Sequence, residues 1–228
     1  MKKILLILAV FFCFLLLCYN GFFYFDRKSE LKSVVQNQAM TRLDPTELVK
    51  LHEGDFILRR GFGFFSDYIS TTLNQGVIDV THAGILVKKG EEWFVIHSLS
   101  SDVTDVDGVQ IQPLNTFLYY SEPKKIIVTR AKNANVATGK KIAGLAESYL
   151  EKQIPFDHTG VIDDDSELFC TELIWKILEK DLHCSTIPTD PNVRKKFFYT
   201  MTPMYSTDYF DIIINQYADY IKKSLPKN

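Results

Sequence analysis

The feature that most constrains this chain is an apolar run close to its N-terminus. Behind Lys2 and Lys3, every residue from Ile4 to Tyr19 is apolar, and apolar residues resume from Phe22 to Phe25. The 22 positions from Ile4 to Phe25 are enough for a helix that crosses a bilayer, which needs about 20 residues. A terminal segment that is apolar on every face does not suit the core of a globular domain. It is therefore expected to stand apart from the fold.

The run lacks the signals that accompany removal of a leader. No A-x-A-like sequence follows it, and Cys13 and Cys18 each follow a large residue instead of the small one typical of a lipoprotein signal. We expect residues 4–25 to be an uncleaved membrane anchor, with Lys2 and Lys3 in the cytoplasm and the domain outside. The alternative is a cleaved signal peptide followed by a secreted or periplasmic domain.

The rest of the chain is long enough for one domain. With 228 residues and 46% hydrophobic content, the sequence can build a core of ordinary size. We expect residues 1–25 to be the anchor or signal, 26–50 a helical spacer and 51–228 the folded domain. The formal net charge of −2 gives no basic surface of the kind that binds nucleic acid. The oligomeric state is left open.

One of the four cysteines begins a predicted helix. Cys170 falls on an apolar stripe with Leu173, Ile174 and Ile177, at the spacing of one helix face. Its thiol should point inward at the first turn, where unpaired backbone N–H groups and the helix dipole favour a thiolate. A catalytic cysteine becomes reactive in such a place, although a free cysteine is also commonly a small buried hydrophobic residue. The choice depends on whether a base reaches the thiol.

A pair of histidines supplies the candidate base. Two strand-like runs flank the dipeptide Lys89-Gly90, which has the form of a two-residue hairpin turn. In the register that this turn implies, His82 lies directly opposite His97, with Cβ atoms about 5 Å apart on one face. A slip of one residue would turn the imidazoles to opposite faces. One imidazole could then take the thiol proton of Cys170 while the other fixes its orientation and tautomer.

Two other accounts of these side chains have less support. Outside the cytoplasm Cys170 could bond to Cys184, but a helix of ten residues would hold them about 15 Å apart, and bridged Cα atoms lie within roughly 7 Å. The acidic loop Asp163–Asp165 is expected to cap the cysteine helix, although its charge opposes a thiolate. With Asp157 and His158 it could bind a metal, but no recognised ligand spacing is present. We therefore predict neither a metal nor a cofactor.

The cysteine and histidine segments carry a family resemblance. His82-Ala-Gly-Ile on one strand, a polar residue near the end of the next, and Cys170-Thr-Glu-Leu on a late helix resemble the circularly permuted papain-like cysteine hydrolases. More narrowly, they resemble the YiiX/YebB-like branch of the NlpC-type superfamily, relatives of lecithin retinol acyltransferase. Gly54-Asp55 and Pro155-Phe156-Asp157 match two further elements, although Phe156 replaces a tyrosine. The resemblance covers roughly residues 50–205.

The resemblance implies both a fold and a set of site residues. The fold would be α+β, a circularly permuted papain-like domain in which helices pack on an antiparallel sheet. Cys170 would be the nucleophile, His82 the base and His97 the third member, where many relatives have glutamate. Asp157 and Thr171 are expected to contact the substrate, with Asp157 also a candidate for organising its loop.

These expectations combine into two hypotheses of function. The first is a membrane-tethered or exported cysteine hydrolase that cleaves an amide or ester through a thioacyl intermediate. Backbone N–H groups at the start of the Cys170 helix would stabilise the oxyanion. The resemblance admits cell-wall peptides and lipid-like acyl groups as substrates, and acyl transfer would use the same residues. The second hypothesis is a non-catalytic module that binds envelope peptides or lipids in the same cleft.

The remaining segments give a coarse secondary structure. Strands are expected at 54–60, 109–112 and 125–131, and helical segments at 44–51, 64–73, 114–120, 136–151, 170–181 and, after an irregular stretch, 209–223.

Overall fold

A twisted antiparallel sheet organises the domain in the computed structural model, which describes residues 2–74, 78–162, 164–183 and 187–218. Its strands lie in the spatial order β4-β3-β2-β1-β5-β6, and each pairs antiparallel with its neighbours. Their bounds are β1 Phe56–Gly61, β2 His82–Lys89, β3 Glu92–Leu99, β4 Gly108–Pro113, β5 Ser121–Ala131 and β6 Phe210–Asn215.

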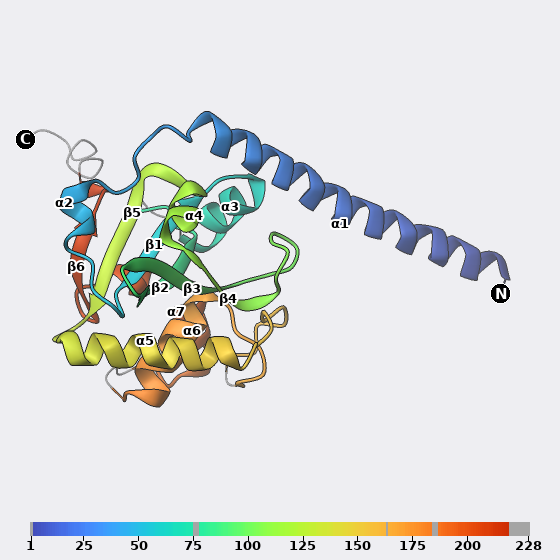
Figure 1. The fold of residues 1–228 in the computed structure, drawn as a ribbon. Helices are drawn as coiled ribbons and strands as arrows, with labels where there is room; N and C mark the ends of the chain where they lie inside the picture. The colour runs from blue at the N-terminus through green and yellow to red at the C-terminus, as the bar shows by residue number, and fades with distance from the viewer. Residues whose placement is uncertain (1, 75–77, 163, 184–186, 219–228) are drawn as a thin grey trace, which may run out of the picture.

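Helices cover the sheet and extend from it (Figure 1). Their bounds are α1 Lys2–Gln36, α2 Pro45–Leu48, α3 Phe64–Ile69, α4 Leu114–Tyr119, α5 Val136–Glu151, α6 Cys170–Lys176 and α7 Pro191–Tyr199. Single turns at Ser70–Asn74 and Ile177–Asp181 prolong α3 and α6, and a short turn at Thr202–Tyr205 precedes β6.

Side-chain alternation along the strands builds two apolar layers. Phe56 and Leu58 of β1 point to the face covered by α5, α6 and α7, whereas Ile57 points to the face covered by α4. Both layers are closed to solvent, because all three side chains have no exposed surface. The α+β fold and the antiparallel sheet predicted from the sequence are confirmed.

The histidine hairpin forms, but in a different register from the predicted one. Lys89 pairs with Glu92 and Ile85 with Ile96, so the turn consists of Gly90 and Glu91. The predicted register is wrong by two residues along one strand. Because side chains alternate with a period of two, this shift keeps both imidazoles on one face of the sheet.

The C-terminal prediction is wrong in kind. Residues 210–215, predicted to be helical, form strand β6 at the edge of the sheet, paired with β5. The three consecutive isoleucines at positions 212–214 suit a strand, and pairing with a strand distant in sequence decides the outcome. Residues 219–223 of that predicted helix lie outside the described residues. Helix α7 lies in the stretch expected to be irregular.

The apolar run and the stretch that follows it form a single helix. Helix α1 has 35 residues, which at 1.5 Å per residue makes it about 52 Å long. Its N-terminal half projects from the domain (Figure 1) and is long and apolar enough to cross a membrane, a property that signal sequences share. Residues 26–36 are helical as expected, but they do not stand off from the domain as a spacer would. Val34 is fully buried and Asp26 is 5% exposed.

Candidate active site

Cys170 is the first residue of α6. The preceding segment is held by two hydrogen bonds of Leu168, whose N–H donates to the Pro155 carbonyl at 2.9 Å and whose carbonyl accepts from the Ser98 hydroxyl. Glu172 turns back to accept from the Phe169 N–H at 3.4 Å, which satisfies one free donor at the helix start. The apolar stripe predicted beside the cysteine is buried, with Leu173, Ile174 and Ile177 without exposed surface.

The two histidines are in direct contact. His82 begins β2 and His97 lies on β3, and His82 Nε2 is 2.9 Å from His97 Nδ1. Gly84 makes this contact possible, because a Cβ at that position would lie 3.2 Å from His97 Cβ and 2.4 Å from Val95 Cγ1. The ring of Phe117 on α4 packs against both imidazoles, with centroids 5.7 Å away.

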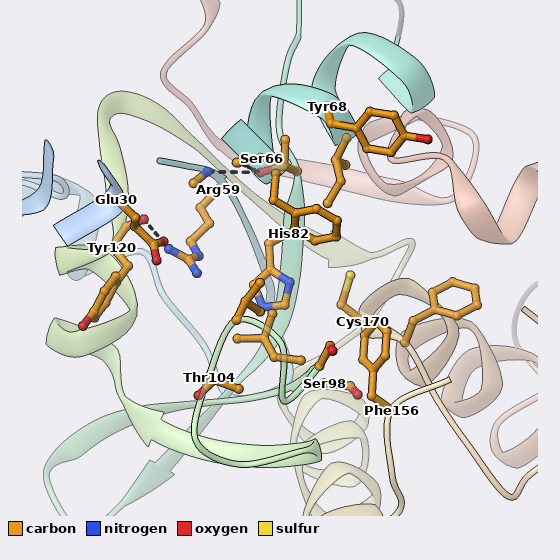
Figure 2. A pocket seen from close by; sticks show the side chains of 18 of the residues that line it. Glu30, Arg59, Ser66, Tyr68, His82, Ser98, Thr104, Tyr120, Phe156 and Cys170 are labelled. Carbon is orange, nitrogen blue, oxygen red and sulfur yellow. Dashed lines mark hydrogen bonds between the residues drawn. The ribbon is translucent and has the colours of Figure 1, made fainter. Parts of the chain in front are cut away.

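A cavity of about 580 Å³ joins the thiol to one of the imidazoles. Figure 2 shows Cys170 and His82 facing this cavity. His97 is fully buried and does not line it. Since His82 Nε2 is engaged with His97, its Nδ1 remains for the cavity. No hydrogen bond joins the Cys170 thiol to either imidazole among the described residues; catalytic hydrogen bonds of this kind are often long without a substrate.

Burial sets the resting protonation of the thiol. It raises the pKa of Cys170 above its ordinary value, and this outweighs the opposing effects. Those are backbone N–H groups of Ala83, Thr171 and Cys170 itself, and the positive charge of Arg59, all of which favour the thiolate. The sequence suggested a thiolate favoured by the helix start; the structure gives a neutral thiol surrounded by groups that stabilise its anion.

Both imidazoles are also neutral at rest. Burial holds the pKa of His82 well below its usual value, with further lowering by His97 and Arg59. Burial likewise lowers the pKa of His97 to about 3, with a contribution from Arg59. In a neutral pair one ring donates and the other accepts. If His82 presents Nδ1 as an acceptor to the cavity, it donates from Nε2 to His97 Nδ1.

Arg59 is a candidate site residue that the sequence analysis did not single out. It pairs with His82 across β1 and β2, lines the cavity, and is 7% exposed. Its guanidinium donates to the Tyr120 carbonyl and lies 4.8 Å from the Phe117 ring centroid, while its Nε has no partner in the described structure. Burial lowers its pKa to about 10, so it stays charged at neutral pH. Two consecutive arginines, Arg59 and Arg60, at the end of an apolar strand were the available signal.

The two expected substrate residues lie at the cavity with their side chains engaged elsewhere. Asp157 Oδ1 accepts from the N–H and hydroxyl of Thr159 and from the Gly160 N–H, at 2.6–2.9 Å, and Oδ2 has no partner in the described structure. It organises its loop. The Thr171 hydroxyl donates to the Phe198 carbonyl, which leaves its backbone N–H beside the sulfur.

Asp164 and Asp165, the described aspartates of the acidic loop, do not cap α6. Asp165 pairs instead with Lys176, the last residue of α6, at 3.0 Å. It also pairs with Lys180 in the turn that follows the helix. Asp163 lies outside the described residues, as does Cys184, the partner in the disulfide alternative. Where the structure describes the chain, Cys170 is a free thiol and no three His, Cys, Asp or Glu side chains gather in a group that could hold a metal ion.

Helix α1 supplies one wall of the cavity, which the sequence did not reveal. Asp26, Arg27, Glu30 and Leu31 line it together with the core residues described above. Asp26 accepts from the Phe65 N–H at 3.1 Å, at the start of α3. Burial raises the pKa of Glu30 to about 7, against the opposing charge of Arg59.

Comparison with known proteins agrees with this architecture. A search of curated proteins finds no match. A solved structure titled as the metalloprotein YiiX from Escherichia coli O157:H7 is similar in fold, with a TM-score of 0.50 and 21% sequence identity over 75% of this chain and 92% of that one. A family model described as permuted papain-like amidase enzyme, YaeF/YiiX, C92 family matches residues 50–201. The chain therefore belongs to the permuted papain-like amidases of the YaeF/YiiX family.

Proposed function

We propose that this amidase family member is a cysteine hydrolase with Cys170 as nucleophile, His82 as base and His97 as the group that orients the base. The observation that supports it most is the 2.9 Å contact between His82 Nε2 and His97 Nδ1, beside a cavity that also holds a cysteine at a helix start. The substrate bond is an amide, as in the family, or an ester.

The reaction follows from the neutral resting pair. As Sγ attacks the carbonyl carbon, the thiol proton passes to His82 Nδ1, so that no stable ion pair is needed beforehand. The tetrahedral intermediate collapses, the bond from carbon to the leaving nitrogen or oxygen breaks, and His82 returns the proton to the leaving group. Water then attacks the thioacyl carbon and gives a proton to His82. The C–S bond then breaks, His82 returns the proton to Sγ, and the acid is released.

Charge that develops in the transition state has nearby partners. The backbone N–H groups of Cys170, Thr171 and Ala83 stabilise negative charge on the sulfur, and those of the helix start are candidates for the oxyanion. Arg59 adds a buried positive charge that favours the thiolate of Cys170. His97 accepts the His82 Nε2–H and so holds the imidazolium in place when it forms.

Location completes the proposal. We infer that α1 remains attached and anchors the enzyme in a membrane with the domain outside the cytoplasm. Removal as a signal peptide is the other use of such a helix. It would take away Tyr19 and Phe23, which contact Asp102 and the cavity residue Phe65.

A thiol-directed activity probe with an amide-like electrophile tests the chemistry. We expect stoichiometric labelling of the wild-type chain at Cys170, no labelling of Cys170→Ala, and slow labelling of His82→Ala. Thermal unfolding of Cys170→Ala should stay close to wild type, because Cys170 is only partly buried. His82→Ala should lower the Tm, because His82 is buried and contacts His97, so labelling is compared at a temperature where every variant is folded.

The urea-unfolded chain provides the control, because its cysteines react there as ordinary thiols without help from His82. Labelling of Cys170 in the folded chain no faster than in the unfolded chain, and unaffected by His82→Ala, would refute the hydrolase and favour a binding module. Loss of folding in Cys170→Ala would assign the cysteine to core packing.

A further inference from the structure

A buried arginine in the cavity wall lacks a partner of opposite charge. Arg59 is 7% exposed, and its only hydrogen bond in the described structure goes from Nη1 to a neutral group, the Tyr120 carbonyl. Its Nε has no partner there. Because a buried charge is seldom left unpaired, and is costly when it is, the cavity favours an anion at this place. The edge of the guanidinium formed by Nε and Nη2 is the part left to bind one.

The neighbouring arginine shows how the fold itself satisfies such a group. Arg60 is 5% exposed, pairs with Asp67 and, at 3.5 Å, with Asp79, and also donates to the Ser66 hydroxyl. Arg60 does not line the cavity, whereas Arg59 does. The unpaired charge of Arg59 is therefore tied to its place in the cavity.

The carboxyl group that acts most strongly on Arg59 comes from α1 and compensates its charge only in part. Figure 2 shows the half-buried side chain of Glu30 beside Arg59 and Tyr120. It makes no ion pair with the guanidinium in the described structure. Burial raises the pKa of Glu30 to about 7, so a large share of it is protonated at neutral pH. A protonated carboxyl group donates a hydrogen bond, so it can share an anion with Arg59.

Arg59 lies on the leaving-group side of the site. In the proposed reaction His82 returns its proton to the leaving atom, so the leaving group lies beside that imidazole. Arg59 pairs with His82 across β1 and β2, and the ring of Phe117 contacts both side chains. Figure 2 shows His82 between Arg59 and Cys170. A group that extends from the leaving atom past His82 therefore reaches the guanidinium.

We propose that the leaving amine of the substrate carries a carboxylate, which binds Arg59 and Glu30 while Cys170 attacks the scissile amide. This proposal rests on the proposed function and names its leaving group. A guanidinium edge offers two parallel N–H donors, which match the two oxygens of a carboxylate. When the bond from the carbonyl carbon to nitrogen breaks, the nitrogen takes the proton from His82, and an amino acid or a short peptide with a free carboxylate is released.

The test compares two substrates that share one acyl group and one kind of scissile amide, N-benzoylglycine and N-benzoylglycine amide. Only the first has a carboxylate on its leaving group. With the full chain in a mild detergent, we expect a kcat/KM roughly ten- to a hundred-fold higher for the first, the effect of a hydrogen bond to a charged group. Arg59→Met should remove this preference. Any effect of Arg59 on the thiol acts on both substrates alike, so the ratio of the two kcat/KM values isolates recognition of the carboxylate.

Arg27→Met is the matched control. Arg27 lines the same cavity and carries the same charge, but it pairs with Asp105 at 2.8 Å and its side chain is 47% exposed. Its loss should leave the preference in place. Glu30→Gln should strengthen the preference, because a competing negative charge is lost while a hydrogen-bond donor is kept.

Three outcomes would overturn the carboxylate site while Cys170-dependent hydrolysis upheld the hydrolase. They are equal kcat/KM for the two substrates in the wild-type chain, a preference that survives Arg59→Met, and faster hydrolysis of N-benzoylphosphoethanolamine, which would assign the site to a phosphate. The wild-type comparison needs no variant, so it decides the matter even if Arg59→Met does not fold. Absence of Cys170-dependent hydrolysis of every substrate would overturn the hydrolase and its leaving group together.

Discussion

Replacing Gly84 with alanine should lower both the stability and the activity of this domain. The added Cβ would lie 2.4 Å from Val95 Cγ1, about 1 Å inside ordinary contact, and 3.2 Å from His97 Cβ. Val95 cannot easily rotate away, because a β-branched side chain in a strand has few rotamers. Overpacking of this kind costs about 1–3 kcal/mol. For a domain of this size that free energy corresponds to a fall of roughly 2–12 °C in Tm.

The activity effect has a separate cause. His97 must yield to the new methyl group, which lengthens its contact with His82 beyond the present 2.9 Å. Because a misplacement of about 1 Å can cost a hundred-fold in rate, we expect kcat to fall between roughly ten- and a hundred-fold. KM should change little, since neither Gly84 nor His97 lines the cavity.

The assay pairs thermal unfolding with steady-state kinetics, and Gly144→Ala is the control. Gly144 lies on an exposed turn of α5 with no atom within 4 Å of an added Cβ, so alanine there should raise stability by up to about 1 kcal/mol and leave kcat unchanged. A Gly84→Ala chain with wild-type Tm and kcat would refute the close fit between these strands.

Three further predictions concern the charges of the site. His97→Ala should reduce kcat less than His82→Ala, because one residue orients the base and the other moves the proton; a larger loss at His97 would reverse the roles. The free energy of unfolding should fall as the pH drops from about 6.5 towards 3, because the unfolded chain then binds protons that the buried imidazoles, His97 with its pKa of about 3, do not. Urea unfolding at several pH values should show a shallower dependence in His97→Phe, and equal slopes would contradict it. Arg59→Met should move the midpoint of the pH profile of Cys170 alkylation upward, because a positive charge that lowers the thiol pKa is lost; an unchanged midpoint would exclude that role.

Much of the site could be predicted because it depends on local patterns. The apolar stripe of α6 placed Cys170 inward, and the period of two along a hairpin placed both histidines on one face. The second inference held although the predicted turn was wrong. The turn is Gly90-Glu91 instead of Lys89-Gly90, which shifts the pairing by two residues and so leaves each side chain on the same face. Gly90 has φ +64°, which suits the first position of a tight turn as well as the second.

The parts that sequence missed depend on contacts between distant segments. Strand β6 forms because its isoleucines find an open sheet edge at β5, which no local pattern announces. Arg59 became a site residue through its pairing with His82, and Glu30 through the docking of α1 on the domain. Asp190, by contrast, left a local signal that was overlooked, because it caps α7 ahead of Pro191 in the usual manner for a helix start.

The unbroken course of α1 also determines how far this enzyme can reach. A domain on a flexible tether explores a hemisphere whose radius grows with the square root of the tether length. A domain clamped to a continuous helix of about 52 Å has no such freedom. If the first half of that helix lies in a bilayer, the cleft stays at one height and one tilt relative to the membrane surface. Insertion of a few glycines after Gln36 would leave this height intact, whereas insertion before Tyr19, ahead of its contact with Asp102, would release it.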